Sequence, residues 1–300
     1  MKNLRTFLIF AALASCSHVV AQDMPLTQVL IDGEDWEVLS IGHRFTEGPA
    51  VDKDGNVFFT DIPNDQIFKI DTKGKVSLFV TKSGRTNGLM IGPDGRLYGC
   101  RNGDKKIVAY SMNGEFETIA DGVTCNDLVV NSSGGIYFTD PPEGKVHYIT
   151  PDGKRRVVAS DMKPNGVILW ANEGTLVVTD AVLPHLWTFR VEADGSLSHK
   201  ERYYMPLQLT TSSKRPGSDG MTIDNAGRLY VTTRAGLQMF DPTGRMGGVI
   251  AKPQPTSLSN VCFGGPGLRY LYVTARDKVY RRYVKPTGVP YFLRAQTKAK

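Results

Sequence analysis

Six short segments of the chain begin with a residue that could bind a metal ion and continue as an apolar run. Their first residues are Glu47, Asn87, Asn126, Asn165, Asp219 and Asn260. All six offer a side-chain oxygen and none is basic. Carboxylate and amide oxygens suit Ca²⁺, which takes about 6–8 oxygen ligands including water, and Mg²⁺, Mn²⁺ or Zn²⁺ remain alternatives. The set predicts one divalent-cation site, provided that the fold gathers these side chains.

A structural explanation competes with the metal site, because Asn-Gly and Asp-Gly pairs are common turn formers. It accounts for some of the six segments. It does not account for Glu47, nor for Asn126 and Asn260, which precede no glycine. We therefore favour the metal interpretation.

The spacing of the six residues indicates the elements that would position them. Successive intervals are 40, 39, 39, 54 and 41 residues. Each unit holds an apolar strand, a glycine-containing turn such as Asp54-Gly55, and a second strand such as Ile136–Thr139; a third strand follows. A four-stranded blade of a β-propeller takes about 40 residues, and its first strand lines the central axis. The chain thus predicts an all-β fold, a six-bladed β-propeller, with the six residues at one channel mouth.

Two irregular segments complete this expected architecture. The fourth unit has about fifteen extra residues around 203–217, which we expect to form a polar loop on the channel mouth. Residues 36–39 precede the first unit, and we expect them to supply the outer strand of the last blade. Residues 22–300 would then form a single domain.

The N-terminus resembles an export signal. Residues 1–21 contain a basic head followed by an apolar run. This run is shorter than the roughly 20 apolar residues that a membrane-spanning helix needs. Cleavage before Gln22, or a lipoprotein signal of residues 1–15 with a lipid anchor at Cys16, would each give an exported protein, secreted or periplasmic. The formal charge of +6 falls to +4 without the leader's Lys2 and Arg5. This small excess does not predict nucleic-acid binding.

Three cysteines follow the leader: Cys100, Cys125 and Cys262. Because the number is odd, at least one must be unpaired. A chain of 300 residues can bury a large core without disulfides. We therefore expect all three to be small buried apolar residues.

Several motifs in this order resemble those of the gluconolactonase and regucalcin (senescence marker protein) family of six-bladed propellers. They are Glu47-Gly-Pro, Asn126-Asp, Phe138-Thr-Asp-Pro-Pro142, Asn165-Gly, Asp219-Gly-Met and Ser259-Asn-Val-Cys-Phe-Gly-Gly265. The resemblance runs from about residue 42 to residue 283. It implies one divalent metal, commonly Ca²⁺, at the top of the channel, and hydrolysis of lactones.

The resemblance also implies roles for individual residues. Glu47, Asn165 and Asp219 match the family's metal ligands, Asp219 also matches its catalytic acid/base, and Asn126 matches a residue that contacts substrate or metal-bound water. Thr124 stands where regucalcin-like members have an arginine. This difference argues against an aldonolactone substrate of the regucalcin type.

The predicted function is that of a metal-dependent hydrolase, a lactonase that opens a sugar or related lactone with metal-activated water. A carboxylate bound to a cation is a poor base, so the ligand role of Asp219 is better supported than its base role. No Gly-x-Ser-x-Gly or His-Glu-x-x-His motif occurs. Asp61, Asp140 and Asp180 end second strands and are expected to fix turns. The alternatives are a non-catalytic propeller that binds a ligand or protein around a structural metal, and a phosphotriesterase-like hydrolase.

Overall fold

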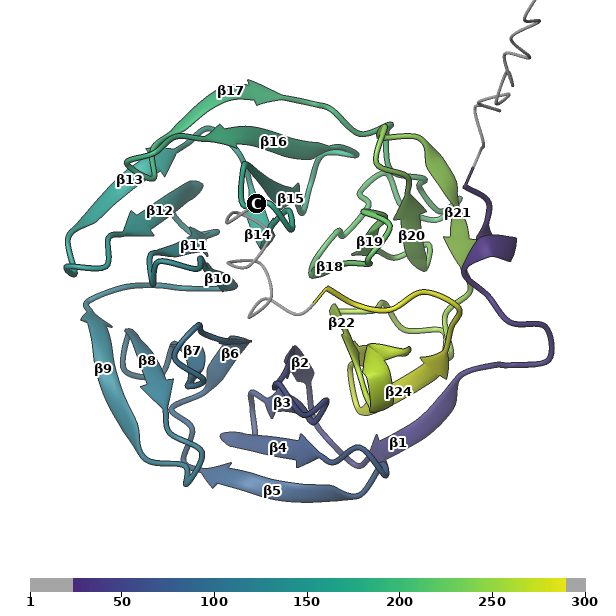
Figure 1. Cartoon of the computed structure of the whole chain (residues 1–300), viewed down its shortest axis with the longest axis horizontal. Coiled ribbons are helices and arrows are strands. Elements are labelled where there is room, and N and C mark those ends of the chain that lie inside the picture. Colours follow the sequence, from purple (N-terminus) through teal and green to yellow (C-terminus); the bar gives the residue numbers. More distant parts are fainter. Residues whose placement is uncertain (1–23, 290–300) are drawn as a thin grey trace, which may run out of the picture.

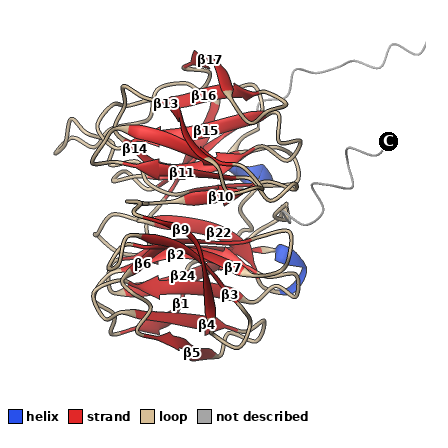
Figure 2. Ribbon diagram, turned by 90° about the vertical axis from the view of Figure 1, so that its left-hand side faces the viewer, coloured by secondary structure: helices blue, strands red, loops and turns tan. Residues whose placement is uncertain are grey.

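The computed structural model describes residues 24–289. These residues form six four-stranded antiparallel sheets around a central axis, which confirms the all-β six-bladed propeller (Figure 1). From the side, the loops lie on the two faces of the ring with the strands between them (Figure 2). The expected export signal, with Cys16 and Gln22, lies outside the described residues. Within residues 24–289, no helix is long and apolar enough to cross a membrane.

Each blade is a meander in which the first strand lies nearest the axis. The first blade contains β2 (Thr46–Val51), β3 (Val57–Asp61), β4 (Gln66–Ile70) and β5 (Val76–Thr81). The second contains β6 (Thr86–Ile91), β7 (Leu97–Arg101), β8 (Lys106–Tyr110) and β9 (Phe116–Asp121). The third contains β10 (Leu128–Val130), β11 (Ile136–Asp140), β12 (Lys145–Ile149) and β13 (Arg155–Ala159).

The remaining blades follow the same order. The fourth contains β14 (Pro164–Leu169), β15 (Thr175–Asp180), β16 (Leu186–Val191) and β17 (Leu197–Glu201). The fifth contains β18 (Met221–Ile223), β19 (Leu229–Thr232), β20 (Leu237–Phe240) and β21 (Met246–Ile250). The sixth contains β22 (Asn260–Gly264), β23 (Tyr270–Ala275), β24 (Lys278–Tyr283) and β1 (Glu37–Ile41). Two short 3₁₀ helices, η1 (Leu26–Gln28) and η2 (Pro266–Leu268), lie outside the sheets.

The N-terminal strand closes the ring, as expected from residues 36–39. β1 pairs antiparallel with β24, and Glu37 lies opposite Arg281. The Arg281 Nε bonds the Glu37 carboxylate at 2.7 Å, and Trp36 Nε1 donates to the carbonyl of Ala251 at 2.8 Å. The sixth blade therefore combines strands from both ends of the chain.

Aspartate-led turns join successive strands on the face opposite the channel mouth. In the β2–β3 turn, Asp52 Oδ1 accepts from the backbone nitrogens of Asp54 and Asn56, each at 2.9 Å. Gly55 adopts φ +90°, a conformation that side chains rarely permit. The same hydrogen bonds recur around Asp241 between β20 and β21. These turns set the hairpin register that brings each first strand to the axis.

The extra segment of the fourth unit departs from the expected polar loop. Tyr203 Oη donates to the carbonyl of Pro242, in the β20–β21 turn on the face away from the mouth. Leu207 is buried, and its backbone nitrogen donates to the carbonyl of Pro184 in the β15–β16 loop at the mouth. The segment thus passes between two blades and reaches the mouth only with its later residues. Apolar burial of Leu207 determines this path.

The expectation of three unpaired, buried cysteines was wrong for two of them. Cys100, in β7, and Cys125, just before β10, form a disulfide between the second and third blades. Cys262 is a free buried thiol. The two bonded residues are 25 positions apart in sequence. Only the packing of neighbouring blades brings their side chains together.

Candidate active site

Hydrogen bonds between neighbouring blades hold the first strands together at the channel mouth. The backbone nitrogen of Gly88 donates to the carbonyl of Asn126, and that of Gly220 donates to the carbonyl of Ser259, each at 2.9 Å. The Thr232 hydroxyl, from the second strand of the fifth blade, also donates to the Ser259 carbonyl at 2.9 Å. Polar side chains at these strand starts therefore face the axis from fixed backbone positions.

Three carboxylates meet at this mouth: Glu47, Asp127 and Asp219. Burial raises the pKa of Glu47 to about 8, and the charge of Asp127 contributes. Burial likewise raises the pKa of Asp127 to about 7. The pKa of Asp219 is raised well above its ordinary value, first by burial and then by repulsion from Glu47 and Asp127. Burial thus destabilises all three carboxylates as anions, and neighbouring carboxylates add to this effect for Glu47 and Asp219.

Asn260 bridges two of these carboxylates with its amide nitrogen. Its Nδ2 donates to Glu47 Oε2 at 3.2 Å and to Asp127 Oδ2 at 3.1 Å. Its Oδ1 accepts from the backbone nitrogen of Val261 at 2.8 Å, which determines the orientation of the amide. In this arrangement the amide nitrogen of Asn260, and not its oxygen, faces Glu47 and Asp127.

The register of the sixth unit also differs from the prediction by one residue. Ser259, not Asn260, matches the first residue of the other units, because its carbonyl accepts from Gly220 as that of Asn126 accepts from Gly88. Asn260 and Asp127 therefore occupy the second position of their units. Four units have glycine at that position: Gly48, Gly88, Gly166 and Gly220. These two side chains are the exceptions to a glycine pattern visible in the sequence.

The glycines of adjacent blades make room for the two exceptions. A Cβ added at Gly88 would overlap Asp127 Oδ1, and one added at Gly220 would overlap Asn260 Oδ1. Asp127 was missed because we assigned the axial position to its neighbour Asn126. The break in the glycine pattern is the sequence signal that identifies it.

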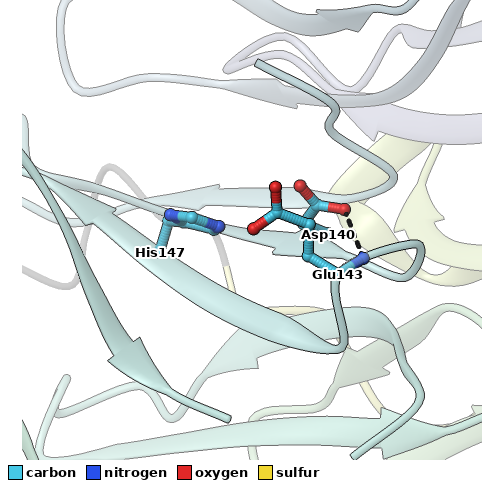
Figure 3. A group of neighbouring side chains, drawn as sticks. All are labelled: Asp140, Glu143 and His147. Carbon is cyan, nitrogen blue, oxygen red and sulfur yellow. Dashed lines mark hydrogen bonds between the residues drawn. The ribbon is translucent and has the colours of Figure 1, made fainter.

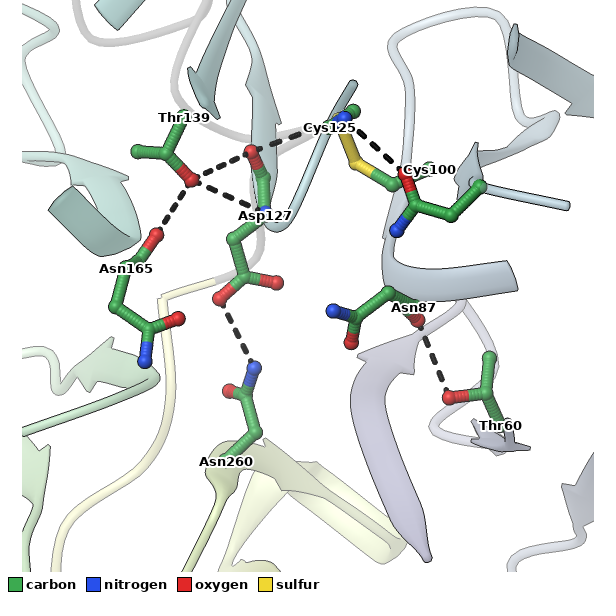
Figure 4. Close-up of a disulfide and its surroundings, with 9 residues drawn as sticks. Thr60, Asn87, Cys100, Cys125, Asp127, Thr139, Asn165 and Asn260 are labelled. Atoms are coloured by element: carbon green, nitrogen blue, oxygen red, sulfur yellow. Dashed lines mark hydrogen bonds between the residues drawn. A yellow bond between two sulfur atoms is a disulfide. The ribbon is translucent and has the colours of Figure 1, made fainter. Parts of the chain in front are cut away.

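Asn165 brings an oxygen to the same region. Its Oδ1 is buried and finds no hydrogen-bond partner among residues 24–289. Its backbone carbonyl accepts from the hydroxyl of Thr139, which also accepts from the backbone nitrogen of Asp127. In Figure 4 the side chains of Asn87, Asp127, Asn165 and Asn260 point toward one another.

Asn126 is placed beside the centre chiefly by its backbone. Its nitrogen donates to the Thr139 carbonyl at 2.9 Å, and its carbonyl accepts from Gly88. Its side chain is half-buried, between the disulfide residue Cys125 and Asp127. The structure thus brings Glu47, Asp219 and Asp127 together, leaves the oxygen of Asn165 unpaired, and sets Asn126 next to them.

Below the carboxylates, the channel forms a cavity of about 110 Å³. Asp127 and Asn260 line it together with apolar residues of the first strands. Gly288 and Val289 also line it, and the chain just before position 290 runs toward the axis in Figure 1. The polar groups are therefore concentrated at the mouth, and the wall behind them is largely apolar.

This arrangement fits a bound divalent cation. Buried carboxylates that raise one another's pKa need a positive charge, and a buried amide oxygen without a donor needs a partner. Oxygen donors of both kinds are typical of sites for hard cations such as Ca²⁺. The residues that could hold the ion are Glu47, Asp127, Asn165 and Asp219.

A separate hydrogen-bonded chain, Ser40–His43–Asp61, lies near the rim. Ser40 Oγ contacts His43 Nε2 at 2.6 Å, and His43 Nδ1 contacts Asp61 Oδ2 at 3.1 Å. The Asp61 carboxylate also accepts from the backbone nitrogens of Arg44 and Phe45. Because Ser40 belongs to the outermost strand of its blade, we assign this chain to the β1–β2 connection. Asp61 has the structural role expected for it, because it also accepts from Asn64 Nδ2 in its own turn at 2.8 Å.

The match to known proteins agrees with this geometry. Residues 45–277 match the family described as the SMP-30/Gluconolactonase/LRE-like region. A gluconolactonase of Zymomonas mobilis is 28% identical over 297 residues, covering 84% of this chain and 82% of that protein. A gluconolactonase structure from Xanthomonas campestris has a TM-score of 0.75 at 24% identity, covering 86% of this chain and 92% of the other. A calcium-binding regucalcin structure from Agrobacterium tumefaciens has a TM-score of 0.71 at 16% identity, covering 85% and 96%. The chain therefore belongs to the SMP-30/gluconolactonase/LRE-like family.

Proposed function

We propose that this protein is a lactone hydrolase that depends on one divalent cation, Ca²⁺ in preference to Mg²⁺, Mn²⁺ or Zn²⁺. One observation carries the proposal: three carboxylates with raised pKa values meet at the channel mouth of a chain that belongs to a gluconolactonase family. The relatives named gluconolactonase and calcium-binding regucalcin support the substrate class and the ion.

Four residues would hold the cation: Glu47, Asp127, Asp219 and Asn165. The carboxylates supply the negative charge, and the unpaired Oδ1 of Asn165 supplies a neutral ligand. When bound, a divalent cation acts as a Lewis acid on a carbonyl oxygen. Asn260 keeps Glu47 and Asp127 oriented through its amide nitrogen, so it acts as a positioning residue.

Asp219 is the proposed base that takes a proton from the attacking water. It is half-buried at the start of the fifth blade, so a substrate at the mouth can reach it. Burial, Glu47 and Asp127 all raise its pKa, and a base near neutral pH needs such a shift. A bound cation lowers proton affinity, and the two neighbouring carboxylates counteract that effect.

Asn126 is the proposed substrate contact. Its half-buried side chain follows Cys125, and the disulfide together with the backbone bonds of Asn126 fixes its position. The neutral amide can bond a hydroxyl or ring oxygen of a lactone. Thr124 offers a hydroxyl in place of an arginine, so we propose a lactone other than an aldonolactone of the regucalcin type.

Lactone turnover with and without metal tests this function. Purified protein is treated with chelator and assayed on a panel of γ- and δ-lactones, then again after Ca²⁺ is restored. We expect activity to disappear on chelation and to return with Ca²⁺. Glu47→Gln should resist this rescue, whereas the turn variant Asp241→Asn should behave as wild type.

Two results would contradict the proposal in different ways. If turnover were unchanged after exhaustive chelation, the proposed metal dependence would be contradicted. Calcium binding without turnover of any lactone or phosphotriester would instead favour the non-catalytic propeller, and turnover of phosphotriesters alone would favour the phosphotriesterase alternative.

We also propose that the protein is exported, secreted or periplasmic. Residues 1–21 have the composition of a signal, and the Cys100–Cys125 disulfide is a feature of proteins in oxidising compartments. Mass spectrometry of the protein from its native source should find Gln22 or a lipidated Cys16 at the N-terminus. Intact Met1 in a cytoplasmic fraction would contradict export.

A further inference from the structure

A second group of possible metal ligands lies on the β11–β12 hairpin of the third blade. One ligand atom from each of Asp140, Glu143 and His147 lies within 4.8 Å of the other two. Asp140 ends β11, His147 belongs to β12, and Glu143 lies in the turn between them. Figure 3 shows a ring nitrogen of His147 facing the two carboxylates.

The hairpin register places these side chains on one face of the sheet. Asp140 pairs with Lys145, and Phe138 pairs with His147. Because paired residues and alternate residues share a face, Asp140 and His147 project to the same side. The Phe138 ring stacks on the His147 ring, with centroids 4.8 Å apart and planes at 6°. This stacking fixes the plane of the imidazole.

The histidine is the observation that distinguishes this group from an ordinary acidic cluster. His147 is only 9% exposed, and its Nε2 has no hydrogen-bond partner within the described part of the chain. An unpaired imidazole nitrogen in a buried position is costly unless a ligand fills the gap. Asp140 is 5% exposed, so its charge also lies in a poorly solvated environment.

We propose that Asp140, Glu143 and His147 form a second metal site that takes a borderline divalent ion, with Zn²⁺ as the representative, and not Ca²⁺. Calcium takes oxygen ligands, whereas zinc combines imidazole nitrogen with carboxylate oxygen. Three protein ligands on an ion leave a position for water. This site is distinct from the central one and does not depend on the proposed lactonase activity.

The ammonium group of Lys145 would compete with the ion for the carboxylate of Glu143. Its Nζ bonds Glu143 Oε2 at 2.8 Å. A bound cation must share Glu143 with this ammonium or displace it. Lys145→Gln should therefore tighten zinc binding. If the cluster only stabilised the hairpin, this change would have no such effect.

The site is connected to the central mouth through one residue. Thr139, the neighbour of Asp140, holds the backbone of Asp127 and the carbonyl of Asn165. An ion on the hairpin would therefore stabilise the strand end that positions two residues of the central site. Zinc should raise the unfolding temperature even when calcium fills the centre, because it binds only the folded chain.

The experiment titrates Zn²⁺ into the calcium-saturated full chain by calorimetry. We expect one equivalent of zinc to bind to wild type, and His147→Gln and Asp140→Asn each to weaken it at least tenfold. Lys145→Gln should tighten it. The exposed His199→Gln, on β17, and the central variant Glu47→Gln should leave this affinity unchanged.

A second measurement keeps the test independent of the variants' folding. Zinc should shift the NMR signals of the His147 ring in wild type and leave those of His199 in place. Three outcomes would overturn the site: no zinc binding to the calcium-loaded protein, equal binding by wild type and a folded His147→Gln, or loss of the zinc site in Glu47→Gln.

Discussion

Aspartates at the channel mouth and aspartates in the turns on the opposite face occupy contrasting environments. In the β20–β21 turn, burial acts to raise the pKa of Asp241, but hydrogen bonds from Thr243 and the Arg245 backbone outweigh it and lower the pKa. At the mouth, burial and carboxylate repulsion raise the pKa of Asp219 instead. Aspartate therefore stabilises a turn as a satisfied anion in one place and stays poorly compensated at the channel mouth in the other.

The difference shows which polar groups the fold itself satisfies. The Asp241 carboxylate accepts from the backbone of its own turn, so folding alone stabilises its charge. The mouth carboxylates receive few donors, chiefly the nitrogen of Asn260 and the backbone of Gly48. Groups that folding leaves under-compensated are the ones available for binding and catalysis.

The largest effect should come from Asp219→Asn. The change keeps an oxygen but removes a charge and the proposed base, so we expect lactone turnover to fall about 100-fold or more, in the range for loss of general base catalysis. The unfolding temperature of the metal-free protein should not fall, because the change relieves repulsion with Glu47 and Asp127. Turnover kinetics and thermal unfolding measure the two effects. Wild-type turnover in the variant would show that Asp219 is not the base.

The next effect concerns the space around Asp127. In Gly88→Ala the new methyl group would overlap Asp127 Oδ1 and displace that carboxylate, so calcium affinity should fall about tenfold or more. Gly174→Ala is the matched control, since the nearest atom to its new Cβ is Asn172 Oδ1 at 3.4 Å, an ordinary contact. Calorimetric titration with Ca²⁺ compares them. Equal affinities would exclude Asp127 from the site.

A moderate effect should appear in the pH dependence of stability. The pKa of Glu47 rises from 4.5 to about 8 in the folded chain, which therefore holds protons that the unfolded chain has released. The metal-free protein should be most stable below pH 4.5 with respect to this group and lose that stability as pH rises through 8. Thermal unfolding across this range should show the decline, and saturating Ca²⁺ should flatten it. A stability that rises with pH without metal would contradict the raised pKa values.

The smallest effect on function should come from a turn. Asp241→Ala removes a carboxylate that accepts from two backbone nitrogens, which should cost about 1–2 kcal/mol of unfolding free energy. Calcium affinity and lactone turnover should stay at wild-type values, as measured alongside denaturant unfolding. A large loss of turnover would mean that the two kinds of aspartate are not functionally separate.

The number of blades was predictable because the units recur at nearly constant spacing. The strands are short, so each unit of about 40 residues can form only one small four-stranded sheet. The positions of Glu47 and Asp219 at the channel mouth were predictable for the same reason. Asp127 was not, because a shift of one residue decides which side chain enters the channel. The orientation of Asn260 depends on the Val261 backbone nitrogen, which no sequence pattern reveals.

The disulfide and the path of the extra segment depend on contacts between blades. Cys100 and Cys125 meet because two sheets pack side by side, and a spacing of 25 residues does not predict this. The 203–217 segment resembles a polar loop by composition. Its buried Tyr204 and Leu207 direct it between blades instead.

The pairing of β1 with β24 has a consequence for the order in which the molecule can assemble. Glu37 and Arg281 are 244 positions apart, so β1 leaves the ribosome long before its partner strand exists. Until then its backbone groups are unpaired and can associate with other chains. Contacts this distant in sequence also slow folding, because a long loop must close first. The first five blades can form as synthesis proceeds, but the ring becomes one cooperative unit only when β24 pairs with β1.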